Sequence, residues 1–303
     1  MAEPFPSHDE IRIARNCWIG TQRADDLHGR SAAVLASSSP DCVLSHRTAA
    51  RLHGLWLPND ASNRIHVATA SRGRSAKDMT RTRRSEITTH RLELGQDEVE
   101  WVDGLPVTSA LRTWRDLASV LEFADLVAVG DSLLRAGVAK ELLVEMVARA
   151  PRARGVLRLR QAVPLLDARS RSHPESHMRV AVMLTGLTEF GVNEPVYRAE
   201  GGWLAEPDIS IPDAKIALEY QGADHADVER MRKDITRERD LRQDDWRVLY
   251  YGPAEVYRRP ESIGVEVLSL ICRRAPALLG RLSSPIVPAP LHPSRQVRRR
   301  AWR

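Results

Sequence analysis

The sequence predicts an α/β protein of the mixed α+β class, and three observations carry that prediction. From Ser172 onward, helical and strand patterns alternate in the order α-β-β-β-α-β-α. Residues 106–168 carry apolar side chains at helical spacing, whereas residues 1–105 mix short helical and strand patterns. All five tyrosines lie at or beyond Tyr197, which marks the C-terminal third as a separate unit.

The first 105 residues are expected to contain both kinds of element. ADDLHGRSAAVLAS and SHRTAARLHGL are typical of short helices, and RIHVATA, EITTHRLEL and VEWVDGLPVT are typical of strands. The basic stretch at residues 71–84 is expected to be an exposed loop. In the helical region that follows, Thr108 and Ser109 are candidate caps and Gly137 is a candidate stop.

The C-terminal part begins with a helix predicted from Ser172 to about Gly191. Residues 194–222 contain three predicted short strands joined by tight turns, and residues 225–245 form a predicted second helix. WRVLYYG is a predicted fourth strand, and ESIGVEVLSLICRRA is a predicted final helix.

The segment EPDISIPDAKIALEYQG, residues 206–222, places acids within two apolar strands. A turn at residues 212–215 pairs Ile211 with Ile216, and continued pairing sets Asp208 opposite Glu219. Because side chains alternate along a strand, one face of this hairpin is apolar and the other carries both acids together with Gln221. Directly opposed residues have Cβ atoms about 4.5–5.5 Å apart, where two carboxylates repel unless a cation or a proton lies between them.

These carboxylates suit a hard cation. Mg²⁺, or Mn²⁺ in its place, takes oxygen ligands and leaves further positions to water and phosphate. The predicted metal ligands are Asp208, Glu219 and Glu175, the last in the first turn of the preceding helix. Glu175 also stands three residues after Ser172, so it matches a helix capping box equally well. A metal held there activates water and neutralises charge on a phosphate.

Composition and charge are those of an ordinary globular protein. Hydrophobic residues make up 43% of the chain and charged residues 28%. Residues 273–303 hold eight arginines and no acid, so the net charge of +5 leaves −3 on residues 1–272. No secretory signal, membrane span, disulfide framework or cysteine metal site is expected, and a cytoplasmic location is the natural expectation.

The C-terminal third resembles a known nuclease superfamily. Pro207-Asp208, followed after ten residues by Glu219-Tyr220-Gln221, resembles the PD-(D/E)XK signature. LEYQGADH and RKDITRERDLRQDDWRVLYY are more narrowly similar to domains related to very-short-patch-repair (Vsr) endonucleases. The resemblance implies a restriction-endonuclease-like α-β-β-β-α-β core over residues 172–275 that hydrolyses phosphodiester bonds with Mg²⁺ or Mn²⁺.

The same resemblance implies roles for individual residues. The implied catalytic residues are Asp208, Glu219, Gln221, Glu175 and His225. Gln221 stands where the signature has lysine, so proton transfer falls to a metal-bound water or to His225. His225 also suits a cap on the following helix.

The N-terminal two thirds resemble another family. VLSHRTAARLHGL and GLPVTSALRTWRDLA are similar to AbiEi-like antitoxin or regulator proteins, a family that begins with a winged helix-turn-helix. The resemblance implies DNA binding and a partner protein from a defence or toxin–antitoxin locus. The expected segments are a mixed AbiEi-like region at 1–105, a helical connector at 106–171, a nuclease-like domain at 172–275 and a basic tail at 276–303.

Two functions of different classes are therefore open. The first is a metal-dependent DNA endonuclease acting on duplex DNA, and the second is a DNA-binding, antitoxin-like regulator with an inactive nuclease fold. A protein-interaction module of a defence locus is a third. Basic residues provide phosphate contacts without sequence information. The candidate DNA-contacting residues are Arg72, Arg74, Lys77, Arg152, Arg154, Lys233 and Arg237.

Overall fold

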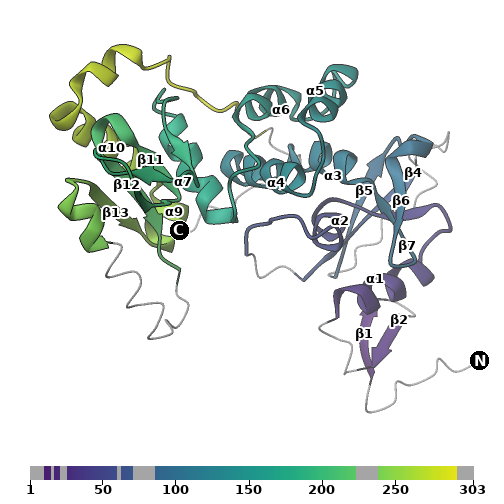
Figure 1. Cartoon of the computed structure of the whole chain (residues 1–303). Helices are drawn as coiled ribbons and strands as arrows, with labels where there is room; N and C mark the ends of the chain where they lie inside the picture. The colour runs from purple at the N-terminus through teal and green to yellow at the C-terminus, as the bar shows by residue number, and fades with distance from the viewer. Residues whose placement is uncertain are drawn as a thin grey trace, which may run out of the picture. The chain divides into compact units, whose positions relative to one another are not determined.

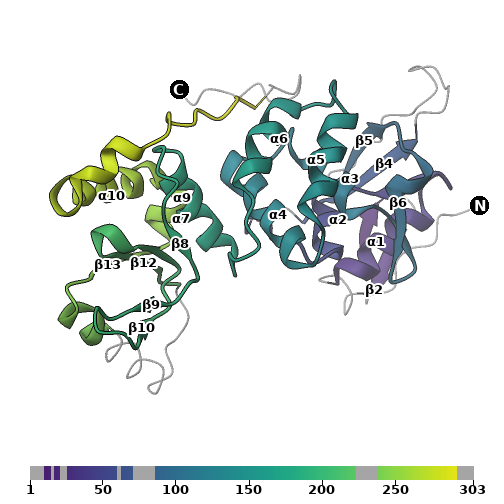
Figure 2. The same cartoon turned by 45° about the horizontal axis from the view of Figure 1, so that its top comes forward.

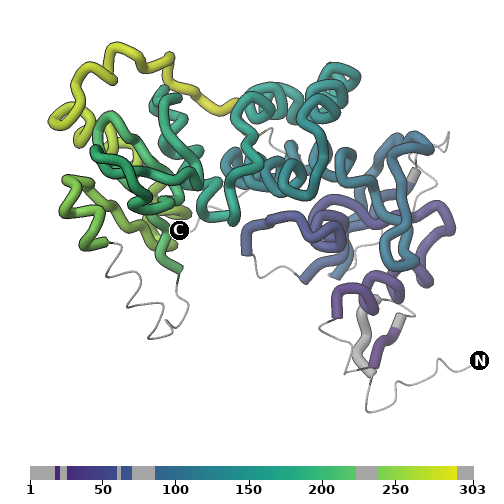
Figure 3. The backbone as a smooth tube through the Cα atoms, viewed as in Figure 1, coloured from purple at the N-terminus to yellow at the C-terminus, as the bar shows by residue number. Residues whose placement is uncertain are grey.

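The computed structural model describes residues 10–14, 17–20, 26–59, 63–70, 86–222 and 238–291. The chain forms two compact units: unit 1 comprises residues 1–121, 141–156 and 291–303, and unit 2 comprises residues 122–140 and 157–290. The chain leaves unit 1 after Leu121 and returns to it at Glu141. Figure 3 traces the backbone from the N-terminus in purple to the C-terminal part in yellow. Both units mix helices and strands, which confirms the expected class. None of the helices in the described ranges has the length and apolar character needed to cross a membrane.

Unit 1 is built on a five-stranded sheet with the strand order β5-β4-β3-β7-β6. Figure 1 labels β4, β5, β6 and β7 of this sheet. Its strands are β3 (Cys42–Leu44), β4 (Ile65–Ala70), β5 (Ile87–Leu92), β6 (Val99–Val102) and β7 (Leu105–Thr108). β3 is antiparallel to β4 and parallel to β7, and β4 is parallel to β5. A separate antiparallel ribbon joins β1 (Glu10–Ala14) to β2 (Cys17–Gly20).

The helices of unit 1 begin and end where local chemistry favours it. α1 (Leu27–Ala36) starts at Asp26, whose carboxylate accepts hydrogen bonds from the N–H groups of His28 and Gly29. α2 is His46–Leu52, α3 is Ala110–Leu117 and α5 is Lys140–Arg149. Val34 of α1 and Ala49 of α2 are buried with the apolar side chains of the sheet, so these helices cover its core.

Several helix boundaries were predicted correctly from the sequence. Ser109 caps α3 by accepting a hydrogen bond from the Arg112 N–H. α4 (Phe123–Arg135) ends just before Gly137, whose φ of +92° is one that glycine adopts without steric cost. Asp103 and Gly104, both at positive φ, form the tight turn that joins β6 to β7.

Unit 2 places helices against one face of a four-stranded sheet with the order β13-β12-β11-β8. The strands are β8 (Gly191–Val192), β11 (Ile209–Ile211), β12 (Ile216–Tyr220) and β13 (Arg247–Tyr251). β11 is antiparallel to both neighbours, whereas β12 and β13 are parallel. The helices are α4, α6 (Val156–Ala162), α7 (His173–Met183), α9 (Pro253–Arg258) and α10 (Pro260–Arg274).

The two faces of this sheet bury different groups. Ile209, Ile216 and Leu218 pack with side chains of α7, α9 and α10. On the other face, Ala217 lies in a smaller cluster with Trp246 and with residues of β9 (Val196–Tyr197) and β10 (Trp203–Ala205). Figure 2 shows β9 and β10 on the side of the sheet away from these helices. Both faces of the central strands are therefore covered.

The structure differs from the expected elements in two places. α7 ends at Met183, well before Gly191, because the chain turns at Gly186 with a φ of +92°. Residues 194–222 contain four strands rather than three, since β9 and β10 form their own ribbon before the β11–β12 hairpin begins. Most of the helix expected at 225–245 lies outside the described residues, but residues 238–243 are helical.

Candidate functional site

The β11–β12 hairpin has the register expected from the sequence. Ile209 pairs with Leu218, and Ile211 pairs with Ile216, around a turn that ends at Lys215 in the left-handed region. Continuing this register by one position would set Asp208, which precedes β11, opposite Glu219. The Asp208 carboxylate accepts a hydrogen bond of 2.8 Å from the Tyr220 N–H, so it is fixed at this end of the hairpin.

The acids of the hairpin differ in exposure. Glu219 is 7% exposed, Asp208 is half-buried, and Gln221 is exposed. Alternation along β12 places Glu219 on the face of Ala217, opposite the face that packs against the helices. Lys215 is directed away from the acids, because its Nζ donates to the Asp244 backbone oxygen at 2.7 Å. The pair therefore lies within a covered sheet rather than on an open surface.

Glu175 is buried at the start of α7 and has several partners. Its carboxylate accepts hydrogen bonds from the Arg171 N–H, the Ser172 hydroxyl and the Asn193 amide, each 2.8 Å long. Ser172 in turn accepts from the Glu175 N–H, as a capping residue does. Asn193 also donates its own N–H to the Asp208 backbone oxygen, which links the cap to the hairpin.

The three predicted carboxylate ligands do not form one compact cluster. Within the described ranges, one group of at least three metal-ligating side chains has its ligand atoms all within 4.8 Å of one another, and it does not include Glu175, Asp208 or Glu219. A shallow pocket of about 270 Å³ lies by the hairpin turn, between Ser210 and Lys215, and neither acid lines it. Any cation at the hairpin would thus be bound by Asp208 and Glu219 without Glu175.

The remaining predicted residues fall into two groups. Arg152 and Arg154 are exposed in the turn between α5 and α6, where they are accessible to a phosphate. The others lie outside the described residues: His225, Lys233, Arg237, Arg72, Arg74 and Lys77.

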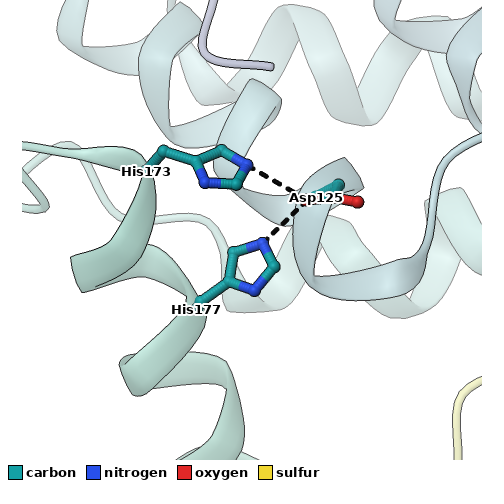
Figure 4. Close-up of side chains that lie close together, drawn as sticks. All are labelled: Asp125, His173 and His177. Atoms are coloured by element: carbon teal, nitrogen blue, oxygen red, sulfur yellow. Dashed lines mark hydrogen bonds and ion pairs between the residues drawn. The ribbon is translucent and has the colours of Figure 1, made fainter. Parts of the chain in front are cut away.

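Asp125, His173 and His177 form a cluster of metal-ligating side chains in unit 2 (Figure 4). This cluster was not predicted from the sequence. Both histidines direct Nε2 at Oδ1 of Asp125, at 3.0 Å from His173 and 2.8 Å from His177. The spacing of four residues between the histidines is a visible signal, because i and i+4 share one helix face. Asp125 lies 48 positions earlier in the chain and has no comparable signal.

The electrostatics of this cluster follow from burial and hydrogen bonding. Burial by itself raises the pKa of Asp125, but the hydrogen bonds from His173 and His177 outweigh it and the pKa is lowered. Burial lowers the pKa of His177, against the opposing effect of Asp125. The cluster therefore pairs a carboxyl group whose pKa is lowered by its hydrogen bonds with an imidazole, that of His177, whose pKa is lowered by burial.

A second buried polar contact ties the same two helices together. Arg179 of α7, 1% exposed, donates to Oδ2 of Asp131 on α4 at 2.5 Å. Asp131 also accepts from the Ser176 hydroxyl at 2.6 Å and from the Asp167 N–H at 2.8 Å. Every partner lies within unit 2, so α4 and α7 are one packed pair.

Part of the chain is similar to a known protein family. Residues 42–168 match the family model of the AbiEi antitoxin C-terminal domain. This match supports the AbiEi-like resemblance over that part of the chain.

Two proteins of Mycobacterium tuberculosis are similar over most of their length. They are the uncharacterised proteins MT2308 and Rv2248, from two strains, each 26% identical over 254 residues that cover 82% of this chain and 89% of the relative. Among solved structures, the RV2827C protein of Mycobacterium tuberculosis shows 16% identity and a TM-score of 0.32, covering 58% of this chain and 66% of that one.

Proposed function

We propose that this protein is an antitoxin-like regulator that binds a partner protein and duplex DNA. The match of residues 42–168 to the AbiEi antitoxin C-terminal domain is the observation that supports it most directly. Regulation of this kind requires surfaces rather than a reactive site. The protein would hold a toxin inactive and would contact DNA through exposed basic residues.

The edge of the unit 1 sheet is the surface we assign to the partner protein. β6 is an edge strand, and an edge strand presents unpaired backbone groups that a second chain can pair with. Trp101, in the middle of β6, is 73% exposed, and exposed tryptophans are enriched among residues that anchor interfaces. Both features lie inside the segment that matches the antitoxin domain.

Growth of cells that express the neighbouring gene of the same locus tests this role. We expect that gene product alone to arrest growth and co-expression of this protein to restore it. Trp101→Ala is expected to weaken the rescue, whereas Trp203→Ala, which removes an equally large and 60% exposed side chain of unit 2, is expected to leave it intact. Growth that is never arrested, or rescue that is equal in both variants, contradicts the assignment.

The exposed turn that carries Arg152 and Arg154 is the candidate DNA contact among the described residues. Fluorescence anisotropy with a duplex from the region upstream of its own gene measures it. Each phosphate contact that is lost reduces the slope of log K against log salt by about 0.9. Arg152→Ala with Arg154→Ala should show that reduction. Arg149→Ala is the matched control, because Glu145 already pairs with that arginine.

Metal-dependent phosphodiester hydrolysis is the second candidate function, and the hairpin register favours it. Continued by one position, the register would set Asp208 opposite the buried Glu219, and a divalent cation would stabilise such a pair. Mg²⁺ or Mn²⁺ held there would bind phosphate oxygens and activate a water molecule. With Gln221 in place of a lysine, the metal-bound water or His225 would carry the proton.

Incubation of plasmid and single-stranded DNA with the protein and Mg²⁺ or Mn²⁺ distinguishes the two functions. Asp208→Ala is expected to abolish cleavage. Asp213→Ala is the control, since that exposed acid of the same hairpin pairs with Arg281 instead. Cleavage that is equal in both variants would reveal a contaminant and remove the catalytic role. Salt-sensitive duplex binding without cleavage would leave the regulator as the function.

A further inference from the structure

We propose that Asp125, His173 and His177 form a zinc site that joins α4 to α7. The site is independent of the antitoxin-like function and of the hairpin acids. His173 and His177 lie one helical turn apart on α7, and Asp125 faces them from the first turn of α4. Figure 4 shows both imidazoles directed toward the same carboxylate. The three side chains are between 9% and 12% exposed, so the site is close to the surface but shielded.

The distances allow a metal to enter with little movement. Zn²⁺ bonds of about 2.0–2.1 Å at tetrahedral angles set the ligand atoms about 3.3 Å apart. The Nε2 atoms now lie 3.0 Å and 2.8 Å from Oδ1 of Asp125. An opening of about 0.3–0.5 Å between the carboxylate and each ring therefore makes room for the ion. Rotation about the side-chain bonds supplies such a shift without moving either helix.

Both rings already have hydrogen-bond partners besides Asp125, as histidines that bind metal usually do. Nδ1 of His173 lies 3.3 Å from the Tyr257 hydroxyl, and His177 forms a hydrogen bond with the backbone of Val256. Both partners belong to α9. The Nε2 atom of each ring faces the shared centre at Asp125.

The chemical types of the three ligands favour some metal ions over others. Two imidazoles and one carboxylate suit Zn²⁺ and related transition ions, whereas Mg²⁺ prefers oxygen ligands throughout. Three protein ligands, with no fourth His, Cys, Asp or Glu in the group among the described residues, leave one tetrahedral position for water. The ion would replace two hydrogen bonds by three coordinate bonds and would stabilise unit 2.

Metal titration of the untagged full-length protein tests the site. After removal of metals with a chelator, we expect one equivalent of Zn²⁺ to bind and to raise the melting temperature. Because loss of an outer hydrogen-bond partner alone costs about 10–100-fold in affinity, His177→Gln should lower the affinity by more than about 100-fold. His66→Gln changes a half-buried histidine on β4 of unit 1, outside this group, and should leave the affinity unchanged.

Cobalt provides a direct readout of the residue that holds the ion. Co²⁺ bound to wild-type protein should show the visible absorption of a tetrahedral site. His177→Cys keeps a metal ligand but removes the imidazole, so its Co²⁺ form should add a thiolate charge-transfer band that wild-type protein lacks, even where His177→Gln fails to fold. No binding to wild-type protein, unchanged affinity in a folded His177→Gln, or the absence of that band would each overturn the proposal.

Discussion

Acidification is expected to destabilise unit 1 through three clustered histidines. His66 and His90 lie side by side on β4 and β5, with Nδ1 and Nε2 3.0 Å apart, and the His46 ring stacks on His90 with centroids 3.5 Å apart. Burial, and then the neighbouring histidines and Arg112, lower the pKa of His46 well below 6.5. Burial, then His90 and nearby arginines, lower the pKa of His66 to about 3, and burial lowers that of His90 to about 4.

The size of the effect follows from proton linkage. Histidine in an unfolded chain has a pKa of about 6.5, so below that pH the unfolded state binds protons that the folded state excludes. The contribution to stability is complete above pH 6.5 and is lost as the pH falls toward the folded pKa values. Between pH 7.5 and pH 5.5 the loss is about 1.4 kcal/mol for each histidine and about 4 kcal/mol for all three. The free energy of unfolding of a typical domain is only about 5–15 kcal/mol in total.

Urea denaturation at pH 7.5 and pH 5.5, followed by hydrogen exchange of peptides from β3, α2 and β4, measures this loss. His90→Gln should reduce the difference between the two pH values by about one third, or about 1.4 kcal/mol. His28→Gln, a half-buried histidine of unit 1 outside the cluster, should not reduce it. Proton NMR titration midpoints near 6.5 for His66 and His90 in the folded protein would refute the reasoning.

Three further changes have outcomes that the structure dictates. Asp131→Ala leaves the buried charge of Arg179 without its partner and should destabilise unit 2 by about 3–5 kcal/mol in urea denaturation, and a loss below 1 kcal/mol would contradict the ion pair. Gly186→Ala should lower the melting temperature more than Gly201→Ala, because both have φ near +90° but only Gly186 has a backbone oxygen close to the added methyl. Glu175→Gln should cost about 1 kcal/mol by weakening the cap of α7, and an unchanged urea midpoint would show that the cap is dispensable.

Local features of the fold were predictable from the sequence. The pairing of Ile209 with Leu218 and of Ile211 with Ile216 follows from a four-residue turn between alternating apolar residues, and the register of β11 and β12 confirms it. The caps at Ser109 and Gly137 follow from side-chain chemistry and backbone freedom in the same way. In each case the residues that determine the geometry lie within about ten positions of one another.

Features that depend on tertiary packing were not predictable. Asp125 meets His177 across 52 positions, and His66 meets His90 across 24 through the parallel pairing of β4 with β5. No local sequence pattern predicts either of these two contacts, because the packing of separate helices and strands determines them. The four-residue spacing of His173 and His177 on one predicted helix was the part of the cluster with Asp125 that the sequence indicated.

The packing of α4 limits which C-terminal segments can follow the part of the chain that matches the antitoxin domain. The segment that matches the antitoxin domain ends at residue 168 and therefore contains α4 but not α7. Asp131, fully buried on α4, depends on Arg179 beyond that boundary. A homologous segment joined to a different C-terminal partner would have to replace this aspartate or supply another cation. Residues at positions 131 and 179 are thus expected to covary among homologues. A protein in which the chain is joined to another sequence after residue 168 is expected to be destabilised, because Asp131 would lack Arg179.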